Sequence, residues 1–160
     1  MSAGSLRVLC QDERALISNV FGEVIESGRV RIFAISFWPR AFVLGGDLMV
    51  WPAKTAWSDF AQAPVETQAV FIHEMVHVWQ AQQGANLLIE KLRAGDRDES
   101  YTYHLSDDCG FADFNIEQQA MIVQHAFLAA NARATPFKNQ AYSRILAELD
   151  GSPFAKTQQV

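Results

Sequence analysis

The sequence lacks several features that would assign it to a familiar class of protein. Its 160 residues include two cysteines, Cys10 and Cys109, and no Cys-x-x-Cys pair, which excludes a disulfide framework and a thiolate zinc site. The 13 lysines and arginines are scattered singly and the formal net charge is −5, so we expect no nucleic-acid partner. No apolar run approaches the roughly 20 residues that cross a bilayer, so we expect no membrane span.

The N-terminal residues also lack the pattern of a secretory signal. Residues 1–7, Met-Ser-Ala-Gly-Ser-Leu-Arg, do not combine a charged region with an apolar region after it. We therefore expect the chain to be made as a soluble cytoplasmic protein. If it leaves the cell, we expect a secretion apparatus that needs no signal peptide to export it.

The composition is that of a folded globular protein. Hydrophobic residues make up 49% of the chain and charged residues 19%, enough apolar material for a core without disulfides. The length corresponds to about one domain, and no repeat or linker divides it. We predict a single domain over residues 1–160, with a flexible tail from about residue 151.

Hydrophobic periodicity predicts an α+β fold that is mostly helical, with a small antiparallel or mixed sheet. Strands are expected at residues 29–36, 41–44 and 47–51, the last two joined as a hairpin through Gly45-Gly46. Helices are expected at residues 12–26, 64–83, 86–94, 115–132 and 140–149. Gly28 ends the first helix, Asn86 caps the third, and Asn115 with Gln118 forms a capping box for the fourth. Residues 95–110 are expected to be irregular.

The segment from His73 to His77 reads His-Glu-Met-Val-His, an HExxH motif. Residues four apart lie on one helix face, about 6 Å apart along the axis, so both imidazoles can bind one metal ion. Glu74 lies beside them and can reach a water at that ion. Among residues 70–79 only these three are polar, and burying them unpartnered would cost several kcal/mol. We therefore favour a metal site, with Zn²⁺ as the ion, over a hydrogen-bonded core cluster or an accidental match.

A catalytic zinc site requires a third protein ligand. Gln80 and Gln83 occupy the glycine and third-histidine positions of a metzincin, which excludes that class. Glu117 is the best candidate, because it precedes a mostly apolar stripe in the first turn of a predicted helix; the alternative is that it only complements the helix dipole. Weaker candidates are His104, Asp108, Asp113 and His125.

Three segments carry a resemblance to a known family: residues 73–80 (HEMVHVWQ), 101–105 (YTYHL) and 114–120 (FNIEQQA). They resemble a bacterial group of zincin-like metallopeptidases that are described as Vgr-related or found near Rhs and type VI secretion elements. The resemblance covers roughly residues 40–130. It implies a zincin-like fold, a gluzincin-type zinc site that falls on His73, His77 and Glu117, and a secretion-system context.

The expected chemistry is hydrolysis of an amide bond. Glu74 would act as general base toward a water at Zn²⁺ and pass the proton to the leaving amine. Candidate donors to the oxyanion are Tyr101, Tyr103 and His104, of which Tyr103 and His104 are our expected catalytic residues. The alternative is that the tyrosines are core or rim aromatics.

Other residues are expected to support this site. The last strand before the motif, residues 47–51, is the expected edge strand for an extended substrate. Candidates for orienting the histidines are Asp113, Asn115 and Gln118. An aromatic group either lines a subsite or, as we favour, belongs to the core; it comprises Phe37, Trp38, Phe42, Trp51 and Trp57.

Two functional interpretations follow. The first is a zinc-dependent metallopeptidase that acts on a peptide or protein, or on peptidoglycan-type cross-links, as a secretion-system effector or processing component. The alternative is a non-catalytic zinc-binding adaptor or structural module of a bacterial secretion apparatus, or a structural metalloprotein without that link. Glu74 favours the enzyme, because a structural site needs no base. The small size favours the module, because 160 residues leave little room for a deep cleft.

Overall fold

The computed structural model describes residues 1–95, 98–106 and 108–147. The predicted tail from residue 151 and residues 148–149 of the last predicted helix therefore lie outside the described residues. The strands are β1 (Leu6–Val8), β2 (Arg31–Ile35), β3 (Phe42–Leu44) and β4 (Leu48–Pro52). The α-helices are α1 (Gln11–Phe21), α2 (Val65–Gln82), α3 (Leu87–Ala94), α4 (Asp98–Tyr101), α5 (Ile116–Ala130) and α6 (Asn139–Ala147). The fold thus has the α+β content that the sequence predicts, and its small sheet precedes the helix that carries the HExxH motif.

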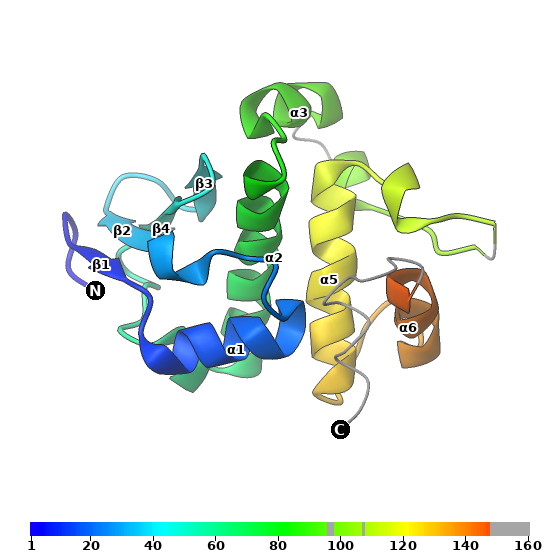
Figure 1. The fold of residues 1–160 in the computed structure, drawn as a ribbon, viewed down its shortest axis with the longest axis horizontal. Helices are drawn as coiled ribbons and strands as arrows, with labels where there is room; N and C mark the ends of the chain where they lie inside the picture. Colours follow the sequence, from blue (N-terminus) through cyan, green and yellow to red (C-terminus); the bar gives the residue numbers. More distant parts are fainter. Residues whose placement is uncertain (96–97, 107, 148–160) are drawn as a thin grey trace.

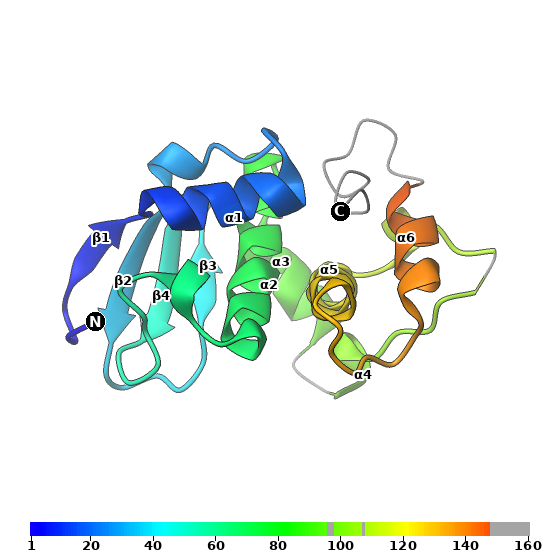
Figure 2. The ribbon, with the colours of Figure 1, turned by 90° about the horizontal axis from the view of Figure 1, so that it is seen from below.

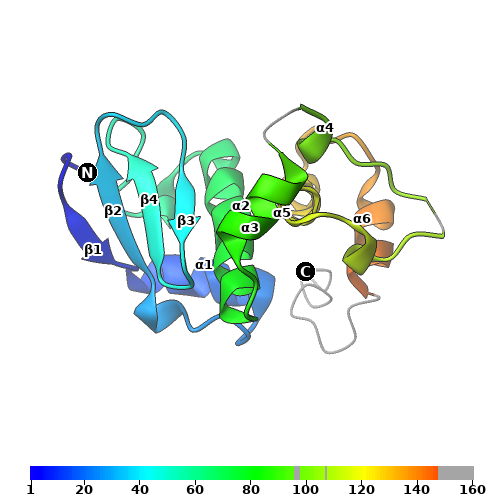
Figure 3. The same cartoon turned by 90° about the horizontal axis from the view of Figure 1, so that it is seen from above.

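Helix α2 runs through the middle of the molecule (Figure 1). The sheet lies on one side of it, and α5 and α6 lie on the other. Helix α1 covers one face of the sheet (Figure 2), and Figure 3 views the sheet from the opposite face. The HExxH helix is therefore positioned to present side chains where the sheet and α5 approach each other.

The sheet is mixed, with the strand order β1-β2-β4-β3. Strands β2 and β4 are parallel, whereas β1 pairs with β2 and β3 pairs with β4 in the antiparallel sense. The predicted hairpin between β3 and β4 is confirmed, and Gly45 in its turn has a φ of 64°, which a glycine adopts without steric cost. Side chains alternate between two faces, so Ile32, Ala34, Met49 and their neighbours reach the core beneath α1.

Helix α2 is buried along most of its length, as predicted for a helix that is apolar on all sides. Its residues from Phe71 to Val78 are all buried. Val70 departs from this pattern, because its side chain is 38% exposed. Helix α5 lies alongside α2 (Figure 1), which brings two distant parts of the chain together.

The first helix ends earlier than predicted, so the boundary at Gly28 is wrong. Helix α1 stops at Phe21, because Gly22 adopts a φ of 62° and its N–H donates to the carbonyl of Ser18. The residues before Val30 then form a short 3₁₀ turn, Ser27–Arg29. Strand β1 and helix α4 were not predicted either, since segments of three and four residues carry no readable periodicity.

Within the part of the chain that the structure describes, no helix has the length and hydropathy of a membrane span. The longest, α2, has 18 residues and carries the buried polar motif. The expectation that no apolar run crosses a bilayer holds for these residues.

A buried carboxylate joins β1, α1 and the segment before α2. Glu13 is fully buried and accepts two hydrogen bonds from the Arg7 guanidinium, at 2.6 and 2.7 Å. It also accepts from the backbone N–H groups of Cys10 and Phe60, both at 2.9 Å. Both oxygens are therefore satisfied, which a buried charge requires.

We expect Glu13→Ala to lower the free energy of unfolding by about 3 kcal/mol or more, because it leaves the Arg7 guanidinium and two backbone donors unpartnered. Urea titration followed by circular dichroism measures the change. Glu26→Ala serves as the matched control, since the Glu26–Arg29 pair is exposed and solvent screens such pairs, so we expect little change. Equal effects of the two substitutions would contradict this account.

Candidate metal centre

Two histidines on α2 face one carboxylate on α5. His73 and His77 lie one turn apart, and their ring centroids are 5.0 Å apart with an interplanar angle of 80°. Glu117 lies in the first turn of α5, whose start is fixed by Asn115 and Gln118 in the predicted capping box. The structure therefore brings together the three residues that the sequence singled out as metal ligands.

The ligand atoms are as close as a single ion requires. Oε2 of Glu117 lies 3.2 Å from Nε2 of His77 and 3.4 Å from Nε2 of His73. The three residues are buried and offer one ligand atom each within 4.8 Å of one another. A tetrahedral Zn²⁺ with bonds of about 2.0–2.1 Å places neighbouring ligand atoms about 3.3 Å apart. The spacing of these ligand atoms fits that geometry.

A chain of amide side chains fixes the orientation of His77. The amide nitrogen of Gln80 donates to the carbonyl of Ile116, at 3.1 Å, and to Oε1 of Gln119, at 2.9 Å. Gln119 in turn donates to the carbonyl of Phe111. The remaining oxygen of Gln80 therefore accepts from Nδ1 of His77, at 2.8 Å, and the proton of the imidazole is on Nδ1.

This tautomer favours a cation between His77 and Glu117. With the proton on Nδ1, the lone pair of His77 Nε2 points at a carboxylate oxygen 3.2 Å away, and two acceptors at that distance repel each other. An imidazolium would satisfy one histidine, but His73 approaches the same oxygen. One metal ion between the three atoms satisfies all of them, so the residues present fit a divalent metal.

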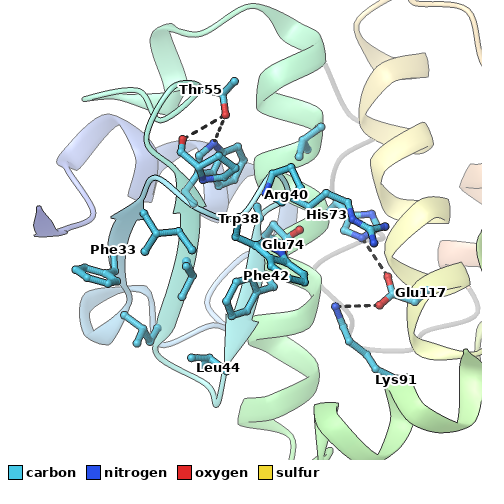
Figure 4. A pocket seen from close by; sticks show the side chains of 18 of the residues that line it. Phe33, Trp38, Arg40, Phe42, Leu44, Thr55, His73, Glu74, Lys91 and Glu117 are labelled. Atoms are coloured by element: carbon cyan, nitrogen blue, oxygen red, sulfur yellow. Dashed lines mark hydrogen bonds and ion pairs between the residues drawn. The ribbon is translucent and has the colours of Figure 1, made fainter. Parts of the chain in front are cut away.

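The charges around Glu117 favour its ionised form. Burial alone would raise the pKa of the Glu117 carboxyl, but its contacts with His73 and His77 hold that pKa well below its ordinary value. Lys91 of α3 adds to this effect, with Nζ 3.1 Å from Oε1. Lys91 thereby binds the oxygen that does not face the histidines (Figure 4).

Glu74 lies beside this cluster with one oxygen uncommitted. Its carboxylate is buried, and its Oε2 has no hydrogen-bond partner. Nδ1 of His73 is the other buried atom without a partner in the described part of the chain. Burial raises the pKa of the Glu74 carboxyl, and the charges of His73 and Lys91 oppose that rise.

A cavity of about 940 Å³ opens onto the site. His73, Glu74 and Glu117 line it on one side, and residues of the sheet line the other (Figure 4). The expectation that a chain of this size leaves little room for a cleft is therefore wrong. The cavity exists because the sheet, α2 and α5 meet without filling the space between them.

The structure separates the candidate oxyanion donors. Tyr101 lines the cavity, whereas Tyr103 and His104 are not among its lining residues. The Tyr103 hydroxyl is 2.6 Å from Nδ1 of His125 and 3.1 Å from the Tyr142 hydroxyl, and burial raises its pKa. Tyr103 is thus held in a polar cluster behind α5, where the tyrosine ring packs against its neighbours.

The weaker ligand candidates do not join the cluster. In the described residues, the group of potential ligands around His73 contains neither Asp113 nor His125, nor the other two alternatives, His104 and Asp108. Asp113 instead accepts from the N–H of Gly110. His125 bonds to Tyr103, and burial lowers its pKa.

The residue that orients His77 was not predicted. Asn115 and Gln118 cap α5, and Asp113 bonds to a loop, so none of these three candidates contacts a histidine. Gln80 does, three residues after His77 on the same helix face. The spacing of three residues could have predicted this contact, although Gln80 served only to exclude the metzincin class.

The expected edge strand was also wrong. The second strand of the hairpin, β4, lies between β2 and β3, so β3 is the edge of the sheet next to the cavity. The aromatic group divides accordingly. Trp51 is buried in the core. Of the remaining members of this group, Phe37, Trp38 and Phe42 line the cavity. Trp57 is exposed and is not among the lining residues.

We expect Gln80→Met to weaken Zn²⁺ binding about 10- to 100-fold, because an apolar side chain of similar size leaves His77 without its acceptor. Competition with a chromogenic chelator measures the dissociation constant. Gln83→Ala, at an exposed position on the same helix end, serves as the control. Unchanged affinity in Gln80→Met would show that Gln80 does not orient the ligand.

Comparisons with known proteins place this geometry in a wider context. No family model matches the chain. It is 30% identical over 149 residues to the type VI secretion system spike protein VgrG2b of Pseudomonas aeruginosa, covering 88% of this chain. The chain spans about 15% of the length of that relative.

A solved structure agrees with this similarity. The effector domain of Pseudomonas aeruginosa VgrG2b matches 92% of this chain and 85% of its own length, with 28% identity and a TM-score of 0.67. The chain is therefore a homologue of the effector domain of a type VI secretion spike protein.

Proposed function

We propose that the protein is a zinc-dependent metallopeptidase with a zincin-like fold. The observation that carries the proposal is the convergence of His73, His77 and Glu117 on one point, with the lone pair of His77 directed at the carboxylate. Glu74 lies next to this point with an uncommitted oxygen, at the end of an open cavity. These residues and the cavity would thus supply the metal ligands, the general base and the space for a substrate.

The residues of the chain divide the work of hydrolysis. His73, His77 and Glu117 would hold the ion, and Gln80 and Lys91 would keep two of these ligands in place. When bound there, Zn²⁺ lowers the pKa of a coordinated water to about 7 and polarises a carbonyl. Glu74 accepts the proton of the attacking water and gives it to the leaving amine.

The cavity wall supplies donors for the developing oxyanion. Tyr101 is the residue of the 101–105 segment that lines the cavity, as does Lys91 of α3. A phenol hydroxyl that donates to the transition state is a common device in amide hydrolysis. We therefore assign this role to Tyr101 in preference to Tyr103 and His104.

A non-catalytic zinc module is less well supported. Structural zinc sites are closed by four protein ligands. In the described part of the chain, the group at this site comprises His73, His77 and Glu117, with no fourth member. His73 and Glu117 line the cavity, so a water or a substrate could reach an ion held there.

We place this activity in type VI secretion. The homologous domain belongs to a spike protein and is described as its effector domain. By that relationship we propose that this chain is an effector that a secretion apparatus delivers, and that its substrate is met after export. The secretion apparatus would be its protein partner.

The decisive experiment compares wild type with Glu74→Gln and Glu117→Ala. We expect one zinc per chain by elemental analysis in the wild type and in Glu74→Gln, and loss of zinc in Glu117→Ala. Hydrolysis of a denatured protein, followed by counting new amino termini, should fall to background in both variants. Glu66→Gln, exposed on α2, should change neither measurement.

Two results would contradict the proposal. Wild-type hydrolysis rates in Glu74→Gln would remove the general base. The absence of zinc in purified wild type, with none taken up when zinc is added, would remove the metal centre.

Tyr101→Phe should lower kcat about 100-fold with little change in zinc content, because it removes one donor to the oxyanion. Tyr103→Phe should leave kcat within a few-fold of wild type and lower the melting temperature, because it removes a partner of His125. Steady-state kinetics and thermal unfolding distinguish the two. A larger loss of kcat in Tyr103→Phe would return the donor role to that residue.

A further inference from the structure

The face of the sheet opposite α1 is apolar where a solvent-facing surface would be polar. Antiparallel sheets usually alternate between an apolar inner face and a polar outer face. Here the strand register aligns one outer row across all four strands, consisting of Leu6, Phe33, Val50 and Phe42. The next row consists of Val8, Arg31, Leu48 and Leu44. Seven of these eight side chains are apolar.

Part of this face continues into the catalytic cavity. The lining residues of the cavity include Phe33, Phe42, Leu44, Leu48 and Val50, together with His73, Glu74 and Glu117. The β1 residues Leu6 and Val8 share the outer face but are not among the lining residues. We call the lining residues of this sheet face the apolar wall. This wall is the part of the face that adjoins the proposed catalytic residues.

Two aromatic side chains on the loop after β2 extend the same wall. Phe37 is 83% exposed and Trp38 is 48% exposed, and both line the cavity. Trp38 meets Phe42 edge-on, with ring centroids 6.3 Å apart. Figure 4 shows Trp38 and Phe42 on the sheet side of Glu74 and His73. Aromatic groups held this way favour large apolar partners.

The charges of the wall restrict its ligands further. Its acidic lining residues, Glu74 and Glu117, both belong to the catalytic site, and its cationic residues are Arg40 and Lys91. Strand β3 forms the edge of the sheet beside this wall, where an extended peptide can add by main-chain hydrogen bonds. Most of the uncharged residues that line the cavity are apolar.

We propose that the substrate is a protein segment with bulky apolar side chains, which lie on Leu44, Phe42 and Trp38 while the peptide bond reaches Glu74. This inference rests on the proposed peptidase function and specifies its substrate class. The small and charged residues of a peptidoglycan cross-link would leave this wall exposed to water. Leucine, methionine and phenylalanine side chains would cover it.

The test uses zinc-loaded protein and quenched fluorescent octapeptides that differ at two central positions, Leu-Phe against Ser-Ser. Isolated cell-wall sacculi serve as the competing substrate. We expect kcat/KM for the Leu-Phe peptide to exceed that for Ser-Ser about 10-fold or more, as burial of a large apolar side chain predicts. Equal rates, or cleavage of sacculi without cleavage of Leu-Phe peptides, would overturn the proposal.

Matched variants locate the binding surface. Leu44→Glu and Trp38→Ser should each reduce kcat/KM for the Leu-Phe peptide about 10-fold and leave zinc content unchanged. Leu6→Glu is the control, because Leu6 is 54% exposed and Leu44 is 53% exposed on the same sheet face. An equal loss in Leu6→Glu, or no loss in either lining variant, would overturn the assignment of this surface.

A binding measurement separates this inference from the peptidase proposal. Fluorescence anisotropy of the labelled Leu-Phe peptide on zinc-loaded Glu74→Gln requires no turnover. If the Glu74→Gln protein binds the peptide and the double variant Glu74→Gln, Leu44→Glu does not, the result would support the apolar site even if no peptide is cleaved. A failure to bind the Leu-Phe peptide more tightly than the Ser-Ser peptide would overturn it, whatever the protein hydrolyses.

Discussion

The structure depends on the packing of α5 against α2, which buries two imidazoles and a carboxylate at one point. Each of these groups is costly to bury without a partner, and the orientation of Gln80 directs the lone pair of His77 at Glu117. A divalent ion would resolve this conflict and would couple the two helices. The same polar cluster would then serve both the stability of the fold and the proposed chemistry.

The other elements of the molecule pack around the contact between α2 and α5. The sheet lies on the far side of α2 from α5 (Figure 1), so the buried motif faces a space that neither element fills. Lys91 from α3 reaches Glu117 from the rim. Glu74 lies between the ion site and the apolar sheet face. Glu74, two of the candidate metal ligands and an apolar sheet face therefore line one cavity, an arrangement that supports the proposed peptidase.

Local patterns predicted local structure well. The capping box of Asn115 and Gln118, the cap at Asn86 and the β3–β4 hairpin were all predicted correctly, because each is formed by residues that lie close together in the chain. The end of α1 before Gly22 was not predicted, because the apolar periodicity of the sequence continues past Gly22 although the helical backbone ends there. Strand β1 has three residues and forms only because β2 offers a partner, which no local window contains.

The sequence by itself determined which residues could form a metal site. The spacing of His73 and His77 follows from the helical repeat, and the buried setting of both follows from the apolar residues between them. Only the tertiary structure decided which residues assist them. Gln80 replaced the expected orienting residues, Tyr101 rather than Tyr103 reached the cavity, and β3 became the edge strand. These outcomes depend on strand order and helix packing, which join residues far apart in the chain and leave no periodic trace in it.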